Sequence, residues 1–295
     1  MEIRVLRYFL AVAREQSITG AAENLHVTQP TLSKQLMDLE NELGKKLFIR
    51  GNRNITLTDD GIYLRKKAQE IIDLVDKTTA NFNTPDEIIG GTISIGAGET
   101  KTMTFLAKVM SKLQSKYPDI HYNLYSGNIE NVTERLEKGL LDFGLILNPN
   151  NMPNLKMLKL PDSEKLCLIM RKDSPLAKLK SIEPNDLLNI PLIIPSSTSN
   201  NLYFLKWLGF DLDKLNIVAT FNLIYNASLL VEQGVGYALC IDSIINPDRN
   251  ENLCIRPLKN SPKLPSFLVW KKYQVFSKPA QKFLDEFQKE LKNIN

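Results

Sequence analysis

Few residues in this sequence are of the kinds from which metal centres and disulfide frameworks are built. The 295 residues include only two histidines and three cysteines. Cys167, Cys240 and Cys254 are far apart and lie in apolar stretches, a pattern typical of reduced core thiols. Neither histidine stands at a metal-ligand spacing from them. We therefore predict no metal, no cofactor and no disulfide.

Signatures of catalysis are missing as well. His26 and His121 have no serine or cysteine nucleophile in a recognisable arrangement beside them. The chain has no Walker loop and no His-Glu-x-x-His motif. Gly96-Ala97-Gly98 begins like a dinucleotide-binding loop, but Lys101 occupies the position of the third glycine. The sequence thus predicts that the protein is not an enzyme.

Long apolar runs are also missing. No run reaches the roughly 18–20 residues that a membrane span needs, and the N-terminal segment lacks the apolar core of a signal peptide. We expect a cytoplasmic protein with no membrane partner. The net charge of +4 permits a nucleic-acid partner without requiring one.

The most informative segment runs from Ser17 to Gly61. Ser17 and Thr28 stand where a hydroxyl group would cap a following helix, and Pro30 falls in the first turn of the second one. Gly44 is expected to end that helix. The segment therefore predicts two short helices joined by a tight turn, an arrangement that can place the second helix in the major groove of DNA.

The second predicted helix has two different faces. One carries a stripe that predicts burial: Leu32, Leu36, Leu39 and Leu43. The other is mostly small or polar: Pro30, Thr31, Lys34, Met37, Asp38 and Asn41, with Gln29 at the helix start and Ser33 on the flank. A leucine stripe by itself indicates only a core, so the helix could also be a plain packing motif.

A hairpin is predicted after the second helix. Two short alternating runs flank a Gly-Asn-Arg-Asn tip within residues 45–57. Arg50 and Arg53 would then lie along the phosphate backbone or enter the minor groove. Residues 1–60 contain eight basic and eight acidic residues, so binding would depend on where the basic side chains point.

The same segment resembles the winged helix-turn-helix of LysR-type transcriptional regulators. The matching positions are Leu6-Arg7-Tyr8-Phe9, Ser17-Ile18, Ala21-Ala22, Leu25, Val27-Thr28-Gln29-Pro30, Leu32-Ser33, Leu39-Glu40, Leu43-Gly44, Leu47-Phe48, Arg50, Leu57-Thr58 and Gly61. The resemblance implies that residues 29–31, Ser33 and Lys34 face double-stranded DNA and that Arg50 is the wing arginine. It also implies a homodimer formed through a linker helix, a homotetramer, and RNA polymerase as a candidate partner.

A linker helix is predicted to begin at Thr58. Its apolar positions alternate between spacings of four and three, which is typical of a coiled-coil seam: Leu64, Ala68, Ile71, Val75, Thr78 and Phe82. A surface helix that packs on its own domain would show a similar stripe. Pro85 and Gly90-Gly91 close the segment as a hinge.

From Thr92 onward, predicted strands and helices alternate, which favours parallel α/β sheets. The chain is expected to cross between two lobes near 148–160 and again near 256–265. This half resembles, more weakly, the effector-binding domain of LysR-type regulators, whose fold is like that of periplasmic binding proteins.

The fold class is therefore α/β overall, with an N-terminal all-α winged helix-turn-helix. We divide the chain into a DNA-binding domain (1–58), a linker and dimerisation helix with its hinge (59–90), and an effector-binding domain (91–295). Within the last domain we assign 91–160 with 266–295 to lobe I, and 161–265 to lobe II.

Ligands of open α/β lobes bind at the carboxyl ends of strands, in the crevice between the lobes. The candidates at such ends are Gly98, Thr100, Thr102, Asn128, Asn148, Ser196, Ser197, Thr198 and Phe221, with Glu99, Gly127 and Asn222 beside them. A hydroxyl cluster at a helix start can also be no more than a cap.

We expect a transcriptional regulator controlled by a small-molecule effector. The alternative is a cytoplasmic solute-binding protein with no role in gene regulation.

Overall fold

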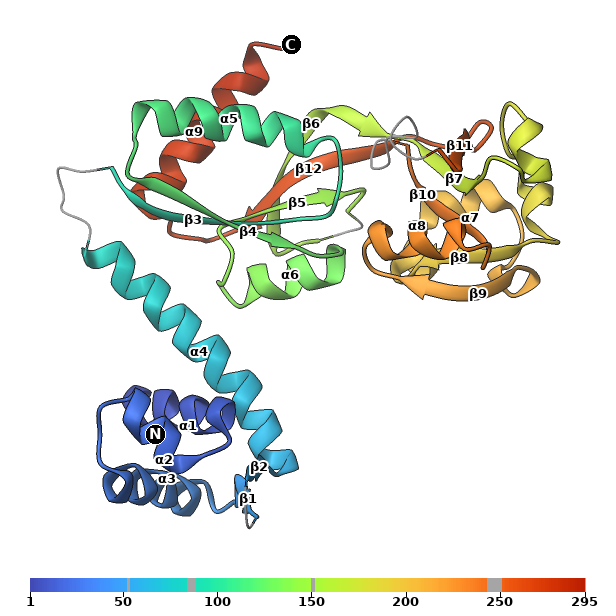
Figure 1. The fold of residues 1–295 in the computed structure, drawn as a ribbon. Coiled ribbons are helices and arrows are strands. Elements are labelled where there is room, and N and C mark those ends of the chain that lie inside the picture. Colours follow the sequence, from blue (N-terminus) through green and yellow to red (C-terminus); the bar gives the residue numbers. More distant parts are fainter. Residues whose placement is uncertain (52–53, 84–88, 150–151, 243–250, 295) are drawn as a thin grey trace. The chain divides into compact units, whose positions relative to one another are not determined.

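The computed structural model describes residues 1–51, 54–83, 89–149, 152–242 and 251–294 (Figure 1). The chain divides into two compact units, Met1–Asn83 and Thr84–Asn295. Each has its own hydrophobic core, and each is described by itself.

The N-terminal unit contains four helices and one hairpin in its described part: α1 (Ile3–Glu15), α2 (Ile18–Asn24), α3 (Gln29–Leu43), β1 (Phe48–Arg50), β2 (Ile55–Leu57) and α4 (Asp59–Asn83). The predicted caps are confirmed. Ser17 Oγ accepts a hydrogen bond from the Gly20 N–H at 3.2 Å, and Thr28 Oγ1 accepts one from the Thr31 N–H at 3.4 Å. Gly44 ends α3 in the left-handed conformation, with φ of 65°.

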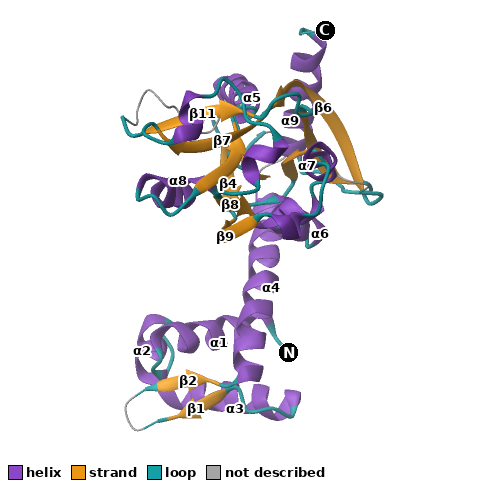
Figure 2. Cartoon of the chain, turned by 90° about the vertical axis from the view of Figure 1, so that its right-hand side faces the viewer, coloured by secondary structure: helices purple, strands orange, loops and turns teal. Residues whose placement is uncertain are grey.

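The core of this unit forms where α1, α2 and α3 meet. Phe9 of α1, Ala21 and Ala22 of α2, and Leu36 of α3 are buried in one cluster. The small alanines allow α2 to approach its neighbours closely. The hairpin joins the cluster through Phe48, whose ring centroid lies 5.2 Å from that of Phe9. Figure 2 shows the two strands side by side, next to α3.

The first half of α4 packs on this same unit. Leu64 and Ala68 are buried in the core cluster together with Ile72, whereas Thr78 and Phe82 are exposed. The prediction of a continuous coiled-coil stripe is therefore wrong for its first two positions. Leu64 and Ala68 are instead buried within their own chain. This is the arrangement expected of a helix that packs on its own domain.

In its described residues, the C-terminal unit contains two five-stranded sheets. The first has the order β4-β3-β5-β12-β6. Its strands are β3 (Gly91–Ala97), β4 (Ile120–Ser126), β5 (Phe143–Leu147), β6 (Leu155–Glu164) and β12 (Leu264–Lys271). Figure 1 shows α5 (Met103–Lys116) and α9 (Lys278–Lys292) on one face of this sheet and α6 (Ile129–Glu137) on the other. Phe283 and Phe287 of α9 fill the core beneath it.

The second sheet has the order β11-β7-β10-β8-β9. Its strands are β7 (Leu166–Arg171), β8 (Pro191–Pro195), β9 (Asn216–Phe221), β10 (Tyr237–Ile241) and β11 (Leu253–Pro257). Helix α7 (Leu202–Leu208) packs into the cluster on one face, and α8 (Ile224–Glu232) packs into the cluster on the other.

The prediction of parallel sheets needs correction, because both sheets are mixed. Strand β12 runs antiparallel to β5 and β6, and β7 runs antiparallel to β10 and β11. A strand that returns from the other lobe enters its sheet in the opposite direction. The first crossing also lies later than expected: β6 stays in the first sheet up to Glu164, and β7 begins in the second at Leu166.

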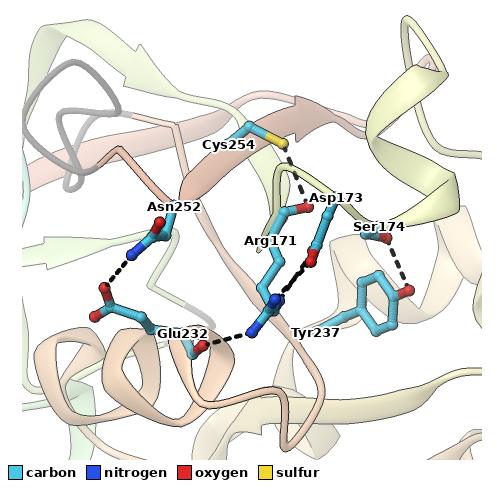
Figure 3. Close-up of polar contacts among 7 residues, drawn as sticks. All are labelled: Arg171, Asp173, Ser174, Glu232, Tyr237, Asn252 and Cys254. Atoms are coloured by element: carbon cyan, nitrogen blue, oxygen red, sulfur yellow. Dashed lines mark hydrogen bonds and ion pairs between the residues drawn. The ribbon is translucent and has the colours of Figure 1, made fainter.

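The C-terminal end of α8 is held by residues at the end of β7 and just before β11 (Figure 3). Arg171, at the end of β7, forms an ion pair with Asp173 and donates a hydrogen bond from Nη1 to the carbonyl oxygen of Glu232 at 3.2 Å. Asn252 donates to Glu232 Oε1 at 3.1 Å. A cation beside the last carbonyl groups of a helix complements their partial negative charge. These contacts hold α8 over the sheet face that it covers.

Gly61 allows α4 to begin close to the hairpin. A Cβ atom at this position would lie 2.1 Å from the carbonyl oxygen of Leu47, a backbone atom that cannot turn aside. We expect Gly61→Ala to lower the free energy of unfolding of the N-terminal unit by about 1–3 kcal/mol. Urea unfolding followed by far-ultraviolet circular dichroism measures the change. Trp207 and Trp270 both belong to the C-terminal unit, so their fluorescence transition should not move.

The matched control is Gly20→Ala, within α2. There the new Cβ atom would meet nothing closer than 3.6 Å. Alanine in a helix is more stable than glycine, so this variant should gain about 0.5–1 kcal/mol. Equal losses in the two variants would contradict the steric explanation.

Candidate DNA-binding face and ligand cleft

The burial of one side of α3 leaves its other side exposed. Leu32, Leu36 and Leu39 are buried in the core. The predicted burial of the fourth stripe residue is wrong: Leu43, in the last turn of α3, is 40% exposed. On the opposite side the predicted DNA-facing residues are exposed, except Ser33, which is half-buried: Gln29, Pro30, Thr31 and Lys34. The structure therefore brings five of the sequence-predicted residues together on the first turns of one exposed helix face.

Hydrogen bonds order the first turn of this face. Gln29 Nε2 donates to Ser33 Oγ at 3.1 Å, and the hydroxyl groups of Thr28 and Thr31 lie 2.8 Å apart. Lys34 makes no ion pair with any residue that the structure describes, so its charge is available to an anionic partner. Short hydroxyl and amide side chains held in this way can reach either base edges or phosphate oxygens.

The position of the hairpin relative to α3 is set by Glu40. Its Oε1 accepts hydrogen bonds from the N–H groups of Leu47 at 2.8 Å and Phe48 at 3.3 Å, and its Oε2 pairs with Lys46 Nζ at 2.8 Å. The side chain is only 11% exposed. Burial by itself raises the pKa of Glu40, but the hydrogen bonds from Lys46 and the two backbone groups outweigh it and lower the pKa. Glu40 thus holds α3 and the hairpin in one fixed arrangement.

Two arginines, Arg50 and Arg53, are predicted to contact DNA from the hairpin. Arg50 ends β1 and pairs in register with Ile55 of β2. This pairing confirms the predicted hairpin. Arg53 lies outside the residues that the structure describes.

A cleft of about 220 Å³ lies in the C-terminal unit where strands of both sheets end. From the first sheet it is lined by residues that follow β3, β4 and β5, and from the second by residues that follow β8 and β9. Six of the predicted effector-binding residues line it: Gly98, Asn128, Asn148, Ser197, Thr198 and Phe221. The cleft therefore lies at the carboxyl ends of strands, where the sequence predicts a ligand site.

Three of the predicted effector-binding residues do not line the cleft. Thr100 and Thr102 turn their hydroxyl groups to the buried carboxylate of Glu164, and Thr102 Oγ1 also lies 2.9 Å from Ser266 Oγ. Ser196 is exposed to solvent outside the lining. The sequence does not reveal that the two threonines point away from the cleft, because their partners Glu164 and Ser266 are distant in the chain.

The walls of the cleft are mostly apolar. Leucine, isoleucine and valine side chains from α6, β5, β7, α8 and β10 form most of its surface. The polar groups come from loops. Asn128 caps α6 by accepting a hydrogen bond from the Asn131 N–H at 3.0 Å, and Thr198 donates to the Pro195 carbonyl oxygen at 2.6 Å. Such a cleft can hold a small amphipathic molecule and orient it through a few amide and hydroxyl groups.

Cys240 and Asn201 also line the cleft, although the sequence did not point to them. Cys240 lies near the end of β10, so the same strand-end rule could have found it. Among the described residues, no group of three or more His, Cys, Asp or Glu side chains is placed to hold a metal ion. No helix in the described part of the chain is long and apolar enough to cross a membrane.

Two family models match the chain. Residues 3–62 match the model described as the bacterial regulatory helix-turn-helix protein of the lysR family, and residues 88–292 match the LysR substrate binding domain. The Hca operon transcriptional activator HcaR of Escherichia coli is 32% identical over 286 residues, covering 95% of this chain and 94% of its own. The transcriptional regulator BsdA of Bacillus subtilis is 27% identical, covering 97% of this chain and 100% of its own.

Solved structures show the same fold. Full-length CbnR in complex with its target DNA superposes with a TM-score of 0.74 at 21% identity, covering 98% of this chain and 99% of that one. Full-length BenM gives a TM-score of 0.55 at 26% identity, covering 100% of this chain and 98% of that one.

The contacts of Glu40 make the stability of the N-terminal unit depend on pH. A carboxyl group whose pKa is lowered by folding adds stability above its ordinary pKa, and this contribution is lost as the pH falls below about 4. Glu40→Gln should therefore cost about 1–3 kcal/mol at pH 7, and should cost progressively less as the pH is lowered towards 3. Urea unfolding at a series of pH values measures both effects. Glu23 is exposed on α2, so Glu23→Gln makes the same charge change and should have little effect on stability at any pH. A similar loss of unfolding free energy in both variants would rule out the contacts of Glu40 as the cause.

Proposed function

Because this chain belongs to the LysR family of bacterial transcriptional regulators, we propose that α3 reads double-stranded DNA while the cleft in the C-terminal unit binds the effector that controls regulation. The observation that carries the proposal is the exposed face of α3, where Gln29, Ser33 and Lys34 lie together. In this role α3 enters the major groove by its first turns and the hairpin follows the phosphate backbone. Arg50 and Arg53 are the proposed backbone contacts of the wing.

The sequence also allowed a solute-binding protein without a regulatory role. The match of residues 3–62 to a regulatory helix-turn-helix does not favour that alternative. A mobility-shift titration on the intergenic DNA upstream of the protein's own gene separates the two functions. A regulator of this family should bind that DNA in preference to a shuffled sequence of equal length, whereas a solute receptor should bind neither.

We propose a homodimer formed through α4. The second half of this helix exposes Leu74 and Phe82, which the N-terminal unit leaves uncovered. A twofold pair of units would place two recognition helices on one side of a duplex, about one helical turn or a multiple of it apart. Two such dimers would then form the homotetramer. We also propose that the protein acts in the cytoplasm and contacts RNA polymerase.

The effector acts, in this proposal, by binding one arrangement of the dimers more tightly than another. A ligand with equal affinity for both arrangements would shift nothing, however tightly it bound. The cleft suits such a role because its lining comes from both sheets, so a change in their relative position changes the site. The proposed contacts are the six predicted residues that line it.

Lys34 gives a direct test of the DNA-binding face. If Lys34 contacts a phosphate group, Lys34→Ala should weaken binding to all sequences and lower the slope of log K against log salt concentration by about 0.9. If it contacts a base, the loss should be about 1–3 kcal/mol and confined to the specific site. Lys292→Ala, at the exposed end of α9, removes the same charge from the other unit and should change neither value. Unaltered binding of Lys34→Ala to every sequence would exclude Lys34 as a contact.

Gly98 gives a test of the cleft. It lines the cleft, and a Cβ atom there would meet no atom closer than 3.7 Å, so the backbone leaves room for the first atom of a side chain. Small metabolites that raise the melting temperature of the wild-type protein should fail to raise that of Gly98→Val. DNA affinity in the absence of these compounds should stay the same. Equal melting-temperature shifts in the two proteins would place the binding site elsewhere.

A further inference from the structure

Two of the three cysteines lie side by side on neighbouring strands of the second sheet. Cys167 of β7 and Cys240 of β10 are direct partners in the antiparallel register, and their Sγ atoms lie 2.9 Å apart. Both are free thiols and both are buried. Neither has a part in the proposed recognition of DNA, because both lie in the C-terminal unit.

The backbone at this pair already suits a covalent bond. Directly opposed residues of antiparallel strands have Cα atoms about 4.5–5.5 Å apart, and disulfides span Cα separations of about 4.4–6.8 Å. The sulfur atoms need to close from 2.9 Å to about 2.05 Å, a movement that small side-chain rotations can supply. No rearrangement of either strand is required.

The two thiols differ in their access to solvent. Cys240 is 5% exposed and lines the cleft, whereas Cys167 is fully buried. Helix α8 covers both of them: Ile224, Ala227 and Val231 belong to the same buried cluster. A reagent small enough to enter the cleft can thus reach Cys240 first, and Cys167 lies beside it on β7.

We propose that Cys240 and Cys167 form a peroxide-oxidised pair, in which a small peroxide enters through the effector cleft, oxidises Cys240 and leaves an intramolecular disulfide with Cys167. This site is independent of the DNA-binding face, because it lies in the other unit. It adds an oxidative modification to the wall of the cleft where the effector is proposed to bind.

The chemistry of this modification balances with hydrogen peroxide as the oxidant. The sulfur of Cys240 attacks one peroxide oxygen, the O–O bond breaks, and one water leaves after proton transfer, so that Cys240 becomes a sulfenic acid. The sulfur of Cys167 then attacks that of Cys240, the S–O bond breaks, and a second water leaves as the S–S bond forms. The two thiols lose two electrons and two protons, which the peroxide takes up.

Burial makes the first step slow. Burial, and after it the neighbouring Cys167 sulfur, raise the pKa of Cys240 well above its ordinary value. The reactive thiolate is then scarce at neutral pH. The pair should therefore stay reduced in a reducing compartment and respond to sustained oxidation rather than to traces of peroxide.

The disulfide would close a loop between residues 73 positions apart in the sequence. It would tie β7, which leads directly from the crossing between the sheets, to β10, which lines the cleft. A loop of this length restricts the unfolded chain strongly, so oxidation should raise the melting temperature of the C-terminal unit by about 5–10 °C.

The test treats the full-length reduced protein with hydrogen peroxide for increasing times. The remaining thiols are then alkylated under denaturing conditions, and the tryptic peptides are identified by mass spectrometry. We expect a single linked species that joins the peptides of Cys167 and Cys240 and lacks two hydrogen atoms. Cys254 serves as an internal control, since its sulfur contacts the carbonyl oxygen of Arg171 at 4.0 Å (Figure 3) and it has no cysteine partner among the described residues.

Variants separate the roles of the two sulfurs. Cys254→Ala should form the link at the wild-type rate. Cys167→Ala should form no link and should instead accumulate a sulfenic acid on Cys240, which dimedone traps. The proposal is overturned if the wild-type protein alkylates fully at both Cys167 and Cys240 after oxidation, or if Cys254 reacts first. Because these measurements are made on the protein without DNA, their failure leaves the proposed regulatory function unaffected.

Discussion

The buried leucine stripe of α3 determines which side of this helix is available to DNA. Leu32, Leu36 and Leu39 pack against the core that contains Phe9 and Ala21, and burial of each large side chain contributes about 1.5–3 kcal/mol. The helix cannot rotate about its axis without exposing this stripe. Its opposite face, which begins with Gln29, is therefore held toward solvent, and Glu40 fixes the hairpin beside it. The packing of the leucines thus determines which side chains of α3 are exposed and can contact a DNA duplex.

The ligand cleft depends on a different constraint, the meeting of strand ends from two sheets. The chain passes from the first sheet to the second after β6 and returns before β12. Each sheet therefore contributes its own loops to the cleft, Asn128 from one side and Thr198 from the other. A ligand that touches both loops is sensitive to the relative position of the sheets. Cys240 lines this site, and its thiol lies 2.9 Å from that of Cys167 on β7, the strand that follows the crossing.

The features predicted correctly from the sequence are those that neighbouring residues determine. Caps at Ser17 and Thr28, the left-handed end of α3 at Gly44 and three of the four predicted buried leucines of α3 all follow from side chains within a few residues of one another. The failures involve partners that are distant in the chain. The sequence predicts Thr100 and Thr102 at the cleft, but both contact Glu164. It predicts Leu64 in a dimer seam, but Leu64 packs in its own unit. The antiparallel strands in each sheet likewise follow from crossings that no local pattern encodes.

In the proposed function, α3 reads base edges in the major groove as one member of a symmetric pair. Methylation interference on the upstream intergenic DNA tests this mode of binding, because methylation of guanine N7 blocks the major groove. We expect interference at two guanine-containing clusters whose centres lie about 10 base pairs, or a multiple of that, apart on one side of the duplex. Binding that is unaffected by guanine N7 methylation, but lost on methylation of adenine N3 in the minor groove, would contradict the account.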